Sequence, residues 1–308
     1  MRVTITGGSG FLAGRLAEDL SEKGHSIKVF TREINRRSKN FEQVSIDWDS
    51  EESLLSVCRD SDVVIHAAGI NAFESNKNPS LAEAFNGRKT TQLAKVASGS
   101  GVKKFFYIST AHVYAELPVG VYSEESETRN KSPYATSHLM GEVGVLETDG
   151  IKNFQVVVLR VGNVYGAPAG TNSSCMKLVV NNFYTQALTS GKIIIESDAK
   201  SQRNFLSAKD FCSIFSQLID SENLCGYSLI NVGATHSRSL LQMANLVASD
   251  VTLRTKRLIE VVQHAQTDLV DHHFDLKINR LRQIGIEIED NYTQEFQGLF
   301  QYLTDTVD

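Results

Sequence analysis

Short apolar runs alternate with amphipathic stretches through the first half of the chain. Between the runs, apolar residues recur every three or four positions, as in the stretch from Phe11 to Gly24 and in a longer one from about Ser80 to Ser100. This alternation predicts a parallel sheet with helices on its faces. In the long helix the predicted buried positions are Leu81, Ala84, Leu93 and Ala97. The predicted strands are Val3–Thr6, Ser26–Phe30, Val44–Ile46, Asp62–Ala67, Lys104–Ser109 and Gln155–Leu159.

The pattern loosens after Gly166. A helix from about 174 to 188 and a short strand near 193–195 indicate the start of a smaller lobe. Leu229–Val232 predicts a strand that returns to the sheet, and the remainder favours helix for most of its length. We therefore expect an α/β protein in which a doubly wound parallel sheet is joined to a smaller, discontinuous lobe.

The composition narrows the class of protein. Hydrophobic residues make up 41% of the chain and charged residues 22%, which is typical of a soluble globular protein. The net charge of −5 argues against nucleic-acid binding. No apolar run approaches the roughly 18 residues of a membrane span, and Met1 leads directly into the first predicted strand without a signal peptide. The four cysteines are widely spaced and favour buried thiols in a reducing compartment, so we expect a cytoplasmic protein.

A glycine-rich turn, Thr-Gly-Gly-Ser-Gly-Phe-Leu-Ala, connects the first predicted strand to the first helix. Glycine allows a tight turn and lets backbone N–H groups approach a pyrophosphate, while the helix N-terminus adds partial positive charge. We therefore expect a Rossmann dinucleotide-binding unit over 1–166 plus about 204–235, and a substrate-binding lobe over about 167–203 plus 236–308. The residues expected to contact the dinucleotide at this turn are Gly7, Gly10, Phe11 and Leu12.

The end of the second predicted strand bears on the choice of cofactor. NAD sites usually place an acid there, whereas this strand ends in Phe-Thr-Arg32, with Arg36 and Arg37 close behind. An arginine can pair with a 2′-phosphate, so NADP(H) is favoured and NAD(H) stays possible. Asp47, just past the third strand, is a candidate acceptor for the adenine amino group, although a loop aspartate can equally cap a turn.

Tyr134 and His138 form the most informative pair in the chain. They are one helical turn apart and share a face. A tyrosine one turn before a lysine is a recurring acid/base device, because the ammonium lowers the pKa of the phenol from about 10 toward neutrality. Here histidine occupies the position of the cation.

These residues resemble the extended short-chain dehydrogenase/reductases, and among them the nucleotide-sugar epimerases, dehydratases and 4-ketoreductases. The resemblance covers nearly the whole chain and includes an asparagine on the long helix, Asn86. The similar segments are the glycine turn, His66–Ala68, Phe106–Tyr114, Leu159–Gly166, Gln202–Leu206 and Asn231–Gly233.

The resemblance implies roles for individual residues. Thr110 falls where the family has its catalytic serine or threonine, Tyr134 on its tyrosine, and His138 on its lysine. Arg203 is similar to the residue that binds the diphosphate of the nucleotide sugar. The resemblance also places Ala67 and Ala68 beside the cofactor and His112 and Asn163 in the substrate cleft.

The histidine leaves three alternatives open. A protonated His138 can substitute for lysine, which would give an enzyme with an acid-shifted pH profile. Another cation, Lys177 or Lys89, can serve instead. Alternatively, the chain binds or senses a dinucleotide or nucleotide sugar without turnover.

The resemblance favours an NADP-preferring nucleotide-sugar 4-epimerase or 4-ketoreductase over the non-catalytic alternative. A dehydratase is not expected, because Ala111 and His112 stand where such enzymes carry an acidic pair. The family also implies polysaccharide biosynthesis and a homodimer formed through the helices at about 80–100 and 134–148. No metal site is expected, since the adjacent His272 and His273 would point apart.

Overall fold

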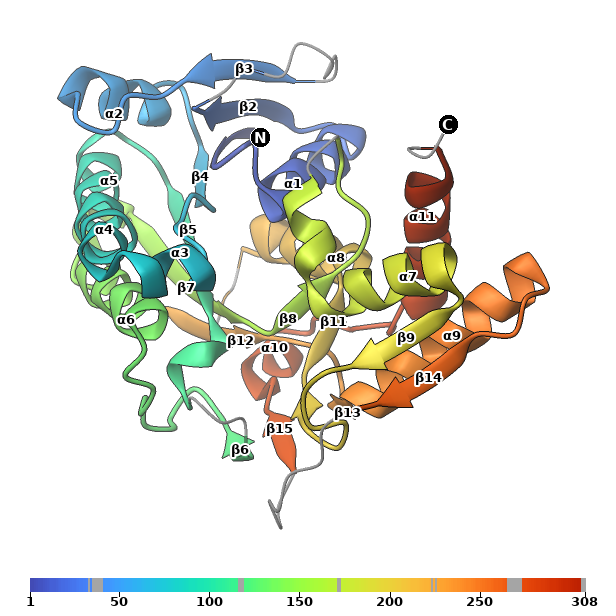
Figure 1. Ribbon diagram of the computed structural model, residues 1–308. Helices are drawn as coiled ribbons and strands as arrows, with labels where there is room; N and C mark the ends of the chain where they lie inside the picture. The colour runs from blue at the N-terminus through green and yellow to red at the C-terminus, as the bar shows by residue number, and fades with distance from the viewer. Residues whose placement is uncertain are drawn as a thin grey trace.

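The computed structural model describes residues 1–32, 34, 41–115, 119–170, 173–222, 224, 226–264 and 273–305. Its central feature is a seven-stranded sheet with the order β12-β7-β5-β4-β1-β2-β3, in which every pair is parallel (Figure 1). This order confirms the predicted doubly wound fold. The strands are β1 (Arg2–Thr6), β2 (Ser26–Thr31), β3 (Glu42–Ser45), β4 (Val63–His66), β5 (Lys104–Thr110), β7 (Gln155–Val161) and β12 (Leu229–Val232).

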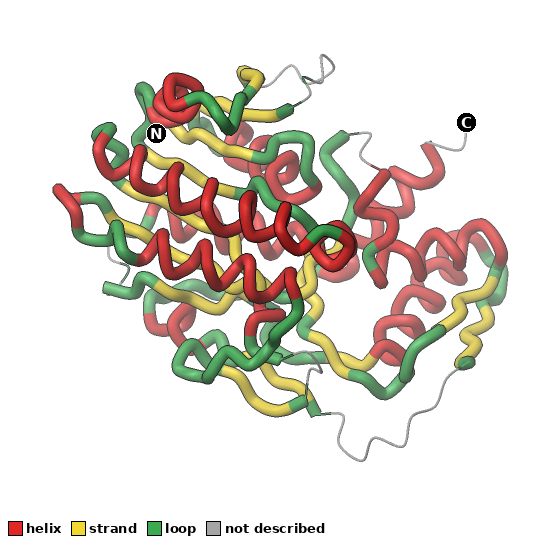
Figure 2. Tube along the Cα trace, turned by 60° about the vertical axis from the view of Figure 1, so that its left-hand side comes forward, coloured by secondary structure: helices red, strands yellow, loops and turns green. Residues whose placement is uncertain are grey.

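Helices cover both faces of this sheet because its strands are apolar on both sides. On one face, α1 (Phe11–Glu22) and α8 (Ala208–Asp220) share a core with Val63 and Ile65 of β4. On the other, Val64 packs in a core with α2 (Glu51–Cys58), α5 (Thr90–Gly99) and α6 (Pro133–Leu146). Figure 2 shows helices lying in front of the strands. No helix in the described ranges is long and apolar enough to cross a bilayer.

The predicted long helix is built from three segments. Pro79–Ala82 (α4) is followed by a π-helical segment at Glu83–Lys89 (η1) and then by α5. The prediction that Leu81 is buried is wrong, since its exposed fraction is 44%, and Ala84 is only half-buried. Ala82 and Asn86 are the buried positions at this end. A π turn has more than 3.6 residues, so a constant helical period cannot be carried through it.

A second core lies beside the sheet, on the right in Figure 1. Its helices are α7 (Val179–Ser190), α9 (Leu240–Thr255) and α11 (Tyr292–Asp305). The expected helix near 174 begins later, after a 3-10 turn at residues 173–177. The C-terminal part contains more strand than expected, because β14 (Glu260–Gln263) pairs with β9 (Lys192–Ile195) and β15 (Phe274–Leu276) pairs with β6 (Gly120–Tyr122).

The remaining elements connect the two cores. Ile278, Leu281 and Ile286, in and around α10 (Asn279–Gln283), pack on the sheet rather than in the second core. The predicted unit boundaries therefore stay a prediction. The other elements are α3 (Ala72–Lys77), β8 (Asn163–Tyr165), β10 (Gln202–Arg203), β11 (Phe205–Ser207) and β13 (Arg238–Ser239).

Candidate functional site

The glycine turn lies against the carboxyl ends of β2 and β4. Gly7 has a φ of +82°, and a Cβ there would come within 2.7 Å of the backbone nitrogen of Ala68, so only glycine suits both the turn and the approach. The N–H groups of Gly7 and Gly8 both donate to the Phe30 carbonyl, at 2.9 and 3.1 Å. The structure thus brings the turn next to Ala67 and Ala68, whose contact with a cofactor stays a prediction.

The turn leads directly into α1, whose N-cap is Gly10. The first amides of a helix have no partner within it, and those of α1 belong to Phe11 and Leu12. A small turn, uncapped amides and a helix N-terminus together fit the pyrophosphate of a dinucleotide.

The structure gives less evidence about the residues that we expect to contact the adenosine part of the cofactor. Arg32 follows β2 and is exposed, while Arg36 and Arg37 lie outside the described residues. The carboxylate of Asp47 accepts the N–H of Asp49 at 2.9 Å, so it does cap a turn, and its adenine contact stays a prediction. The sequence also has an acid in this region, Glu33, which directly follows Arg32 and lies outside the described residues.

The predicted catalytic residues meet where β5 ends and α6 begins. Thr110 is the last residue of β5, and Tyr134 lies in the first turn of α6, whose N-cap Ser132 accepts the N–H of Ala135. The ring of Tyr134 meets the ring of His138 edge-on, with centroids 4.6 Å apart, and that of His112 at 6.3 Å. Thr110, His112, Tyr134 and His138 therefore form one cluster.

His138 is buried and carries no charge. Its side chain is 6% exposed, and its Nδ1 lies 2.9 Å from the Tyr107 hydroxyl. Burial, and then the nearby His112, lower the pKa of His138 to about 3. The expectation of a protonated histidine in the role of the lysine is therefore wrong, because the desolvated imidazole is neutral at pH 7.

The phenol of Tyr134 likewise lacks the cation that would acidify it. Burial raises its pKa, and the Thr110 side chain opposes this rise only in part. Of the two alternative cations, Lys89 is engaged by Asp49 at 2.7 Å, and Lys177 is exposed on the 3-10 turn before α7. No cation among the described residues contributes to the shift of Tyr134, so its phenol stays protonated at pH 7.

Next to this cluster lies a positive charge, the guanidinium of Arg203. The Arg203 guanidinium donates to the Ser201 hydroxyl and the Gln202 carbonyl, and within the described ranges it has no carboxylate partner. Its charge acts on His112, whose pKa is lowered first by desolvation from the atoms packed around the ring and then by Arg203, although the residue as a whole is exposed. Asn163 Nδ2 lies 3.5 Å from His112 Nε2. Arg203 therefore fits an anionic group on the substrate.

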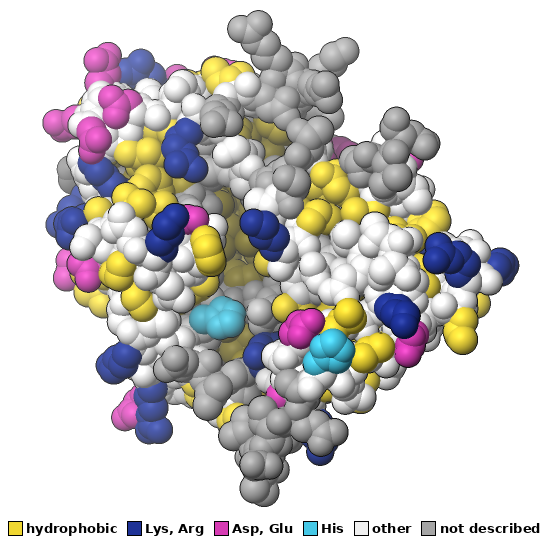
Figure 3. All heavy atoms as spheres, viewed as in Figure 1, with side chains coloured by type: hydrophobic (Ala, Val, Ile, Leu, Met, Phe, Trp, Pro, Cys, Tyr) yellow, Lys and Arg dark blue, Asp and Glu magenta, His cyan; other side chains and the backbone are white. Residues whose placement is uncertain are grey.

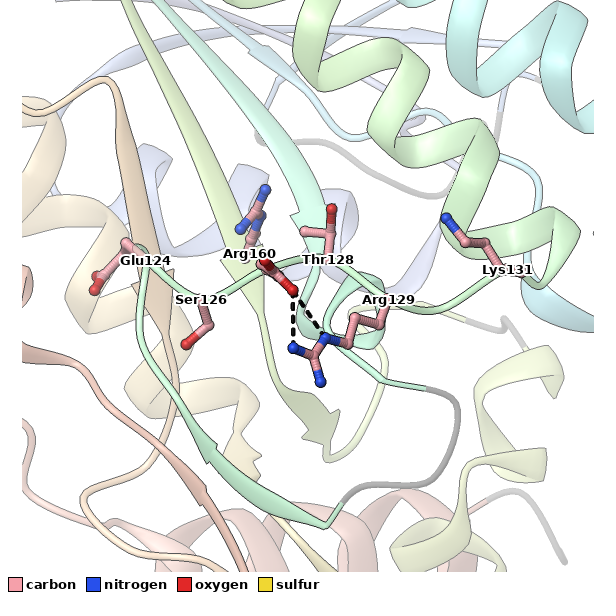
Figure 4. Close-up of a pocket in the computed structure, with 7 residues that line it drawn as sticks. Glu124, Ser126, Thr128, Arg129, Lys131 and Arg160 are labelled. Carbon is pink, nitrogen blue, oxygen red and sulfur yellow. Dashed lines mark hydrogen bonds and ion pairs between the residues drawn. The ribbon is translucent and has the colours of Figure 1, made fainter.

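The space-filling view shows where a ligand would enter. A hollow runs down the middle of the face drawn in Figure 3, between the sheet with its helices and the smaller lobe. A separate cavity of about 550 Å³ lies along residues 124–131 (Figure 4). It is lined by charges of both signs, and its Arg129 pairs with Glu127 at 2.8 Å. None of the predicted catalytic residues lines this cavity.

Two residues have a larger part than the sequence interpretation gave them. Tyr107, to which the sequence analysis assigned no role, touches His138 directly, and Asn86 binds both the loop after β4 and Ser137 of α6. The available signal was the alternation along the strand, which places Tyr107 on one face with Phe105 and Ser109. Among the described residues, no group of three or more His, Cys, Asp or Glu side chains could hold a metal ion.

The parallel sheet, the glycine turn and the tyrosine at the helix start define a dinucleotide-dependent oxidoreductase fold. A family model described as the NAD dependent epimerase/dehydratase family matches residues 3–233. The chain belongs to this family, which confirms the predicted extended short-chain dehydrogenase/reductase class. The membership supports an NAD-dependent enzyme over a binding protein without turnover.

The chain is similar to several curated members of the family. It is 24% identical over 292 residues to a UDP-N-acetyl-alpha-D-glucosaminuronate decarboxylase of Bacillus cytotoxicus, covering 91% of this chain and 88% of that protein. It is 26% identical to a dTDP-D-glucose 4,6-dehydratase of Mus musculus, covering 87% and 74%.

The fold is also similar to solved structures. A UDP-N-acetylglucosamine 4-epimerase from Methanobrevibacter ruminantium in complex with UDP-N-acetylmuramic acid matches with a TM-score of 0.84 and 20% identity, over 99% of this chain and 98% of that one. A UDP-glucuronic acid 4-epimerase from Bacillus cereus with UDP-glucuronic acid and NAD matches with a TM-score of 0.81 and 19% identity, over 99% and 100%.

The neutral histidines predict how stability changes with pH. The pKa of His66 is lowered to about 3 by burial, as is that of His138. Because the unfolded chain titrates its histidines near 6.5, it takes up protons that the folded protein does not. The stability present above pH 6.5 is therefore lost as the pH falls toward 3, by up to about 1.4 kcal/mol per pH unit for each group.

We expect His138→Gln to flatten this slope between pH 7 and pH 5, measured as the urea-unfolding free energy. The exposed His264, changed to Gln, is the matched control and should leave the slope unchanged. A His138→Gln variant with the wild-type slope would contradict a neutral His138.

Proposed function

We propose that this protein is an NAD(P)-dependent nucleotide-sugar 4-ketoreductase or 4-epimerase that uses Tyr134 as its acid/base. The observation that carries the proposal is one cluster in which Thr110, Tyr134 and His112 meet beside the guanidinium of Arg203, which has no carboxylate partner among the described residues. A hydroxyl, a phenol and a cation are the groups needed to hold a sugar oxygen and a diphosphate.

In this proposal each side chain has one task. Arg203 binds the diphosphate and so orients the sugar. The Thr110 hydroxyl donates to the reacting oxygen, which places that oxygen beside the phenol of Tyr134. Tyr134 then transfers its proton to the oxygen as negative charge develops there. The glycine turn would hold the pyrophosphate of the dinucleotide, and its nicotinamide would supply the hydride chemistry at the sugar carbon that carries this oxygen.

The uncharged surroundings favour one direction of reaction. Reduction of a ketone needs a protonated Tyr134, and burial keeps it protonated. Oxidation of the sugar alcohol needs a phenolate, and burial, which raises the pKa of Tyr134, disfavours that ion at pH 7. We therefore place 4-ketoreduction first. Epimerisation, which includes an oxidation step, is second and is supported by the solved 4-epimerases of the same fold.

We expect the purified protein to oxidise NADPH or NADH in the presence of a nucleotide-linked 4-keto-6-deoxy sugar, followed by absorbance across UDP, dTDP and GDP forms. Tyr134→Phe should lower kcat by about 10²- to 10⁴-fold, because it removes the proton donor. His138→Lys should raise the rate of the reverse oxidation, because an ammonium stabilises the phenolate.

The matched control is Tyr184→Phe, which removes another buried hydroxyl, one bonded to Asp250 in the smaller lobe. Tyr184→Phe should leave the rate of reduction and the rate of the reverse oxidation unchanged. Absence of turnover with every sugar, together with no binding of any nucleotide sugar, would refute the proposed function.

We also propose that NADP(H) is preferred over NAD(H). The support is Arg32, which is exposed and follows β2, the strand whose Phe30 carbonyl accepts from the glycine turn, and an arginine can pair with a 2′-phosphate. We expect NADPH to bind more tightly than NADH in a fluorescence titration, and Arg32→Ser to remove most of that difference. Tighter binding of NADH by the wild type would contradict this preference and would agree with the NAD-bound relatives.

We propose a homodimer formed through α5 and α6. Met140 and Val143 on α6 are exposed apolar side chains, at 41% and 59%. Sedimentation velocity should give twice the 34.0 kDa of one chain, and Val143→Glu should shift the distribution toward monomer. A wild type that sediments as a monomer at all concentrations would contradict the dimer.

A cytoplasmic location and a role in polysaccharide biosynthesis stay predictions, to be tested by cell fractionation and by the glycans of a deletion strain.

A further inference from the structure

Two of the three most exposed large apolar side chains among the described residues lie at one end of helix α9. Leu258, in the turn after the helix, is 88% exposed, and Leu253, in its last turn, is 70% exposed. The third is Phe73 on α3, at 74%. Single exposed apolar side chains are common on protein surfaces, whereas two of them at one end of a helix mark a surface that can bind something.

The turn that carries Leu258 is fixed to the end of the helix by hydrogen bonds on both sides of that residue. The backbone N–H groups of Arg257 and Ile259 donate to the hydroxyls of Thr255 and Thr252, both at 3.3 Å. The side chain of Ile259 is buried in the core of the smaller lobe. Leu258 therefore lies between two anchored residues, and its side chain is held out in the solvent.

The charged side chains around this turn include two cations in excess. Each acidic side chain of residues 250–260 already has a cation as its partner. These pairs are Asp250 with Arg254, at 2.7 Å, and Glu260 with Lys192, at 2.9 Å. Lys256 and Arg257 are exposed, and neither forms an ion pair with a carboxylate in the described part of the chain. On a chain with a net charge of −5, this end of α9 is therefore locally positive.

The place of this turn in the molecule favours a lipid surface as its partner. The end of α9 lies at the outer edge of the smaller lobe, away from the sheet, on the right in Figure 1. Lys and Arg side chains gather at that edge beside apolar ones (Figure 3). A protein partner would need a hollow shaped to receive two protruding leucines. An anionic bilayer needs no such shape, because its interface accepts apolar side chains and its negative surface attracts lysine and arginine.

We propose that residues 253–258 are a docking site for an anionic lipid bilayer. Leu253 and Leu258 enter the interface of the bilayer, while Lys256 and Arg257 bind the phosphates of its lipids. Two apolar side chains and two cations give a reversible contact, far weaker than the insertion of a membrane-spanning helix. The proposal goes beyond the proposed reaction and does not depend on it, because none of these residues belongs to the cluster around Tyr134.

The docking is tested by sedimenting the full chain with large lipid vesicles at low salt. We expect binding to vesicles of equal parts phosphatidylglycerol and phosphatidylcholine, and little binding to phosphatidylcholine alone. Lys256→Gln combined with Arg257→Gln should lower the partition coefficient by about 25-fold, because each basic residue near an anionic surface contributes about 5-fold. Leu253→Ser combined with Leu258→Ser should lower it by about 10-fold or more, because the apolar contact with the interface is lost.

The matched control is Phe73→Ser combined with Lys77→Gln, which removes a similarly exposed apolar side chain and an exposed lysine from α3. This control should bind vesicles as the wild type does. Entry into the interface is measured separately with Leu258→Trp, since the single tryptophan of the chain, Trp48, is buried. We expect the fluorescence of the added indole to shift to shorter wavelength when the anionic vesicles are added.

Absence of vesicle binding by the wild type, or equal binding by the wild type and both turn variants, would overturn the proposal. Self-association of the wild type that is lost in the leucine variant, measured by sedimentation velocity, would also overturn it, because the turn would then be a protein interface. These measurements need no sugar and no turnover, so their outcome is separate from that of the proposed reaction.

Discussion

The close approach of α6 to β5 and to the π-helical segment sets the chemistry of this site. Glycine permits it at two positions: a Cβ on Gly141 would strike the Asn86 carbonyl, and one on Gly144 would lie 2.0 Å from the Thr91 hydroxyl. This contact removes water from residue 138, where an ion would lose its hydration energy. A neutral imidazole bonded to Tyr107 is compatible with that burial.

A buried ion pair also holds helix α6 to strand β7 of the sheet. Arg160 of β7 donates to Glu142 of α6 through two nitrogens, at 2.6 to 3.1 Å, and the Ser109 hydroxyl donates to the same carboxylate at 2.5 Å. Removing one partner of such a pair leaves an uncompensated buried charge, which typically costs about 3 to 5 kcal/mol. Because Ser109 directly precedes Thr110, the network also fixes the end of β5 relative to Tyr134.

The smaller lobe is attached by an equally polar contact. Glu295 of α11 is 3% exposed and accepts hydrogen bonds from Arg15 of α1 and from the backbone of Ala167 and Lys209. The helix that begins at the glycine turn is thereby tied to the lobe that carries the second core.

The features of the fold that depend on interactions between sequence neighbours could be predicted, and those that depend on distant contacts could not. The parallel strands and the glycine turn were predictable, because strand periodicity and turn conformation depend on neighbours in the sequence. Leu81 was predicted wrongly, since a π turn is stabilised by its packing on α6 and leaves no simple period. The strands β14 and β15 were missed because each is paired with a segment far away in the chain.

By itself, the sequence determined that Tyr134 is followed one turn later by His138 within a dinucleotide-binding fold. Both facts depend on spacing and residue type alone. Only the tertiary structure decided that the histidine is uncharged, because a pKa depends on the atoms that displace water around the ring. Those atoms come from Tyr107, His112 and α6, which the fold brings together and the order of residues does not.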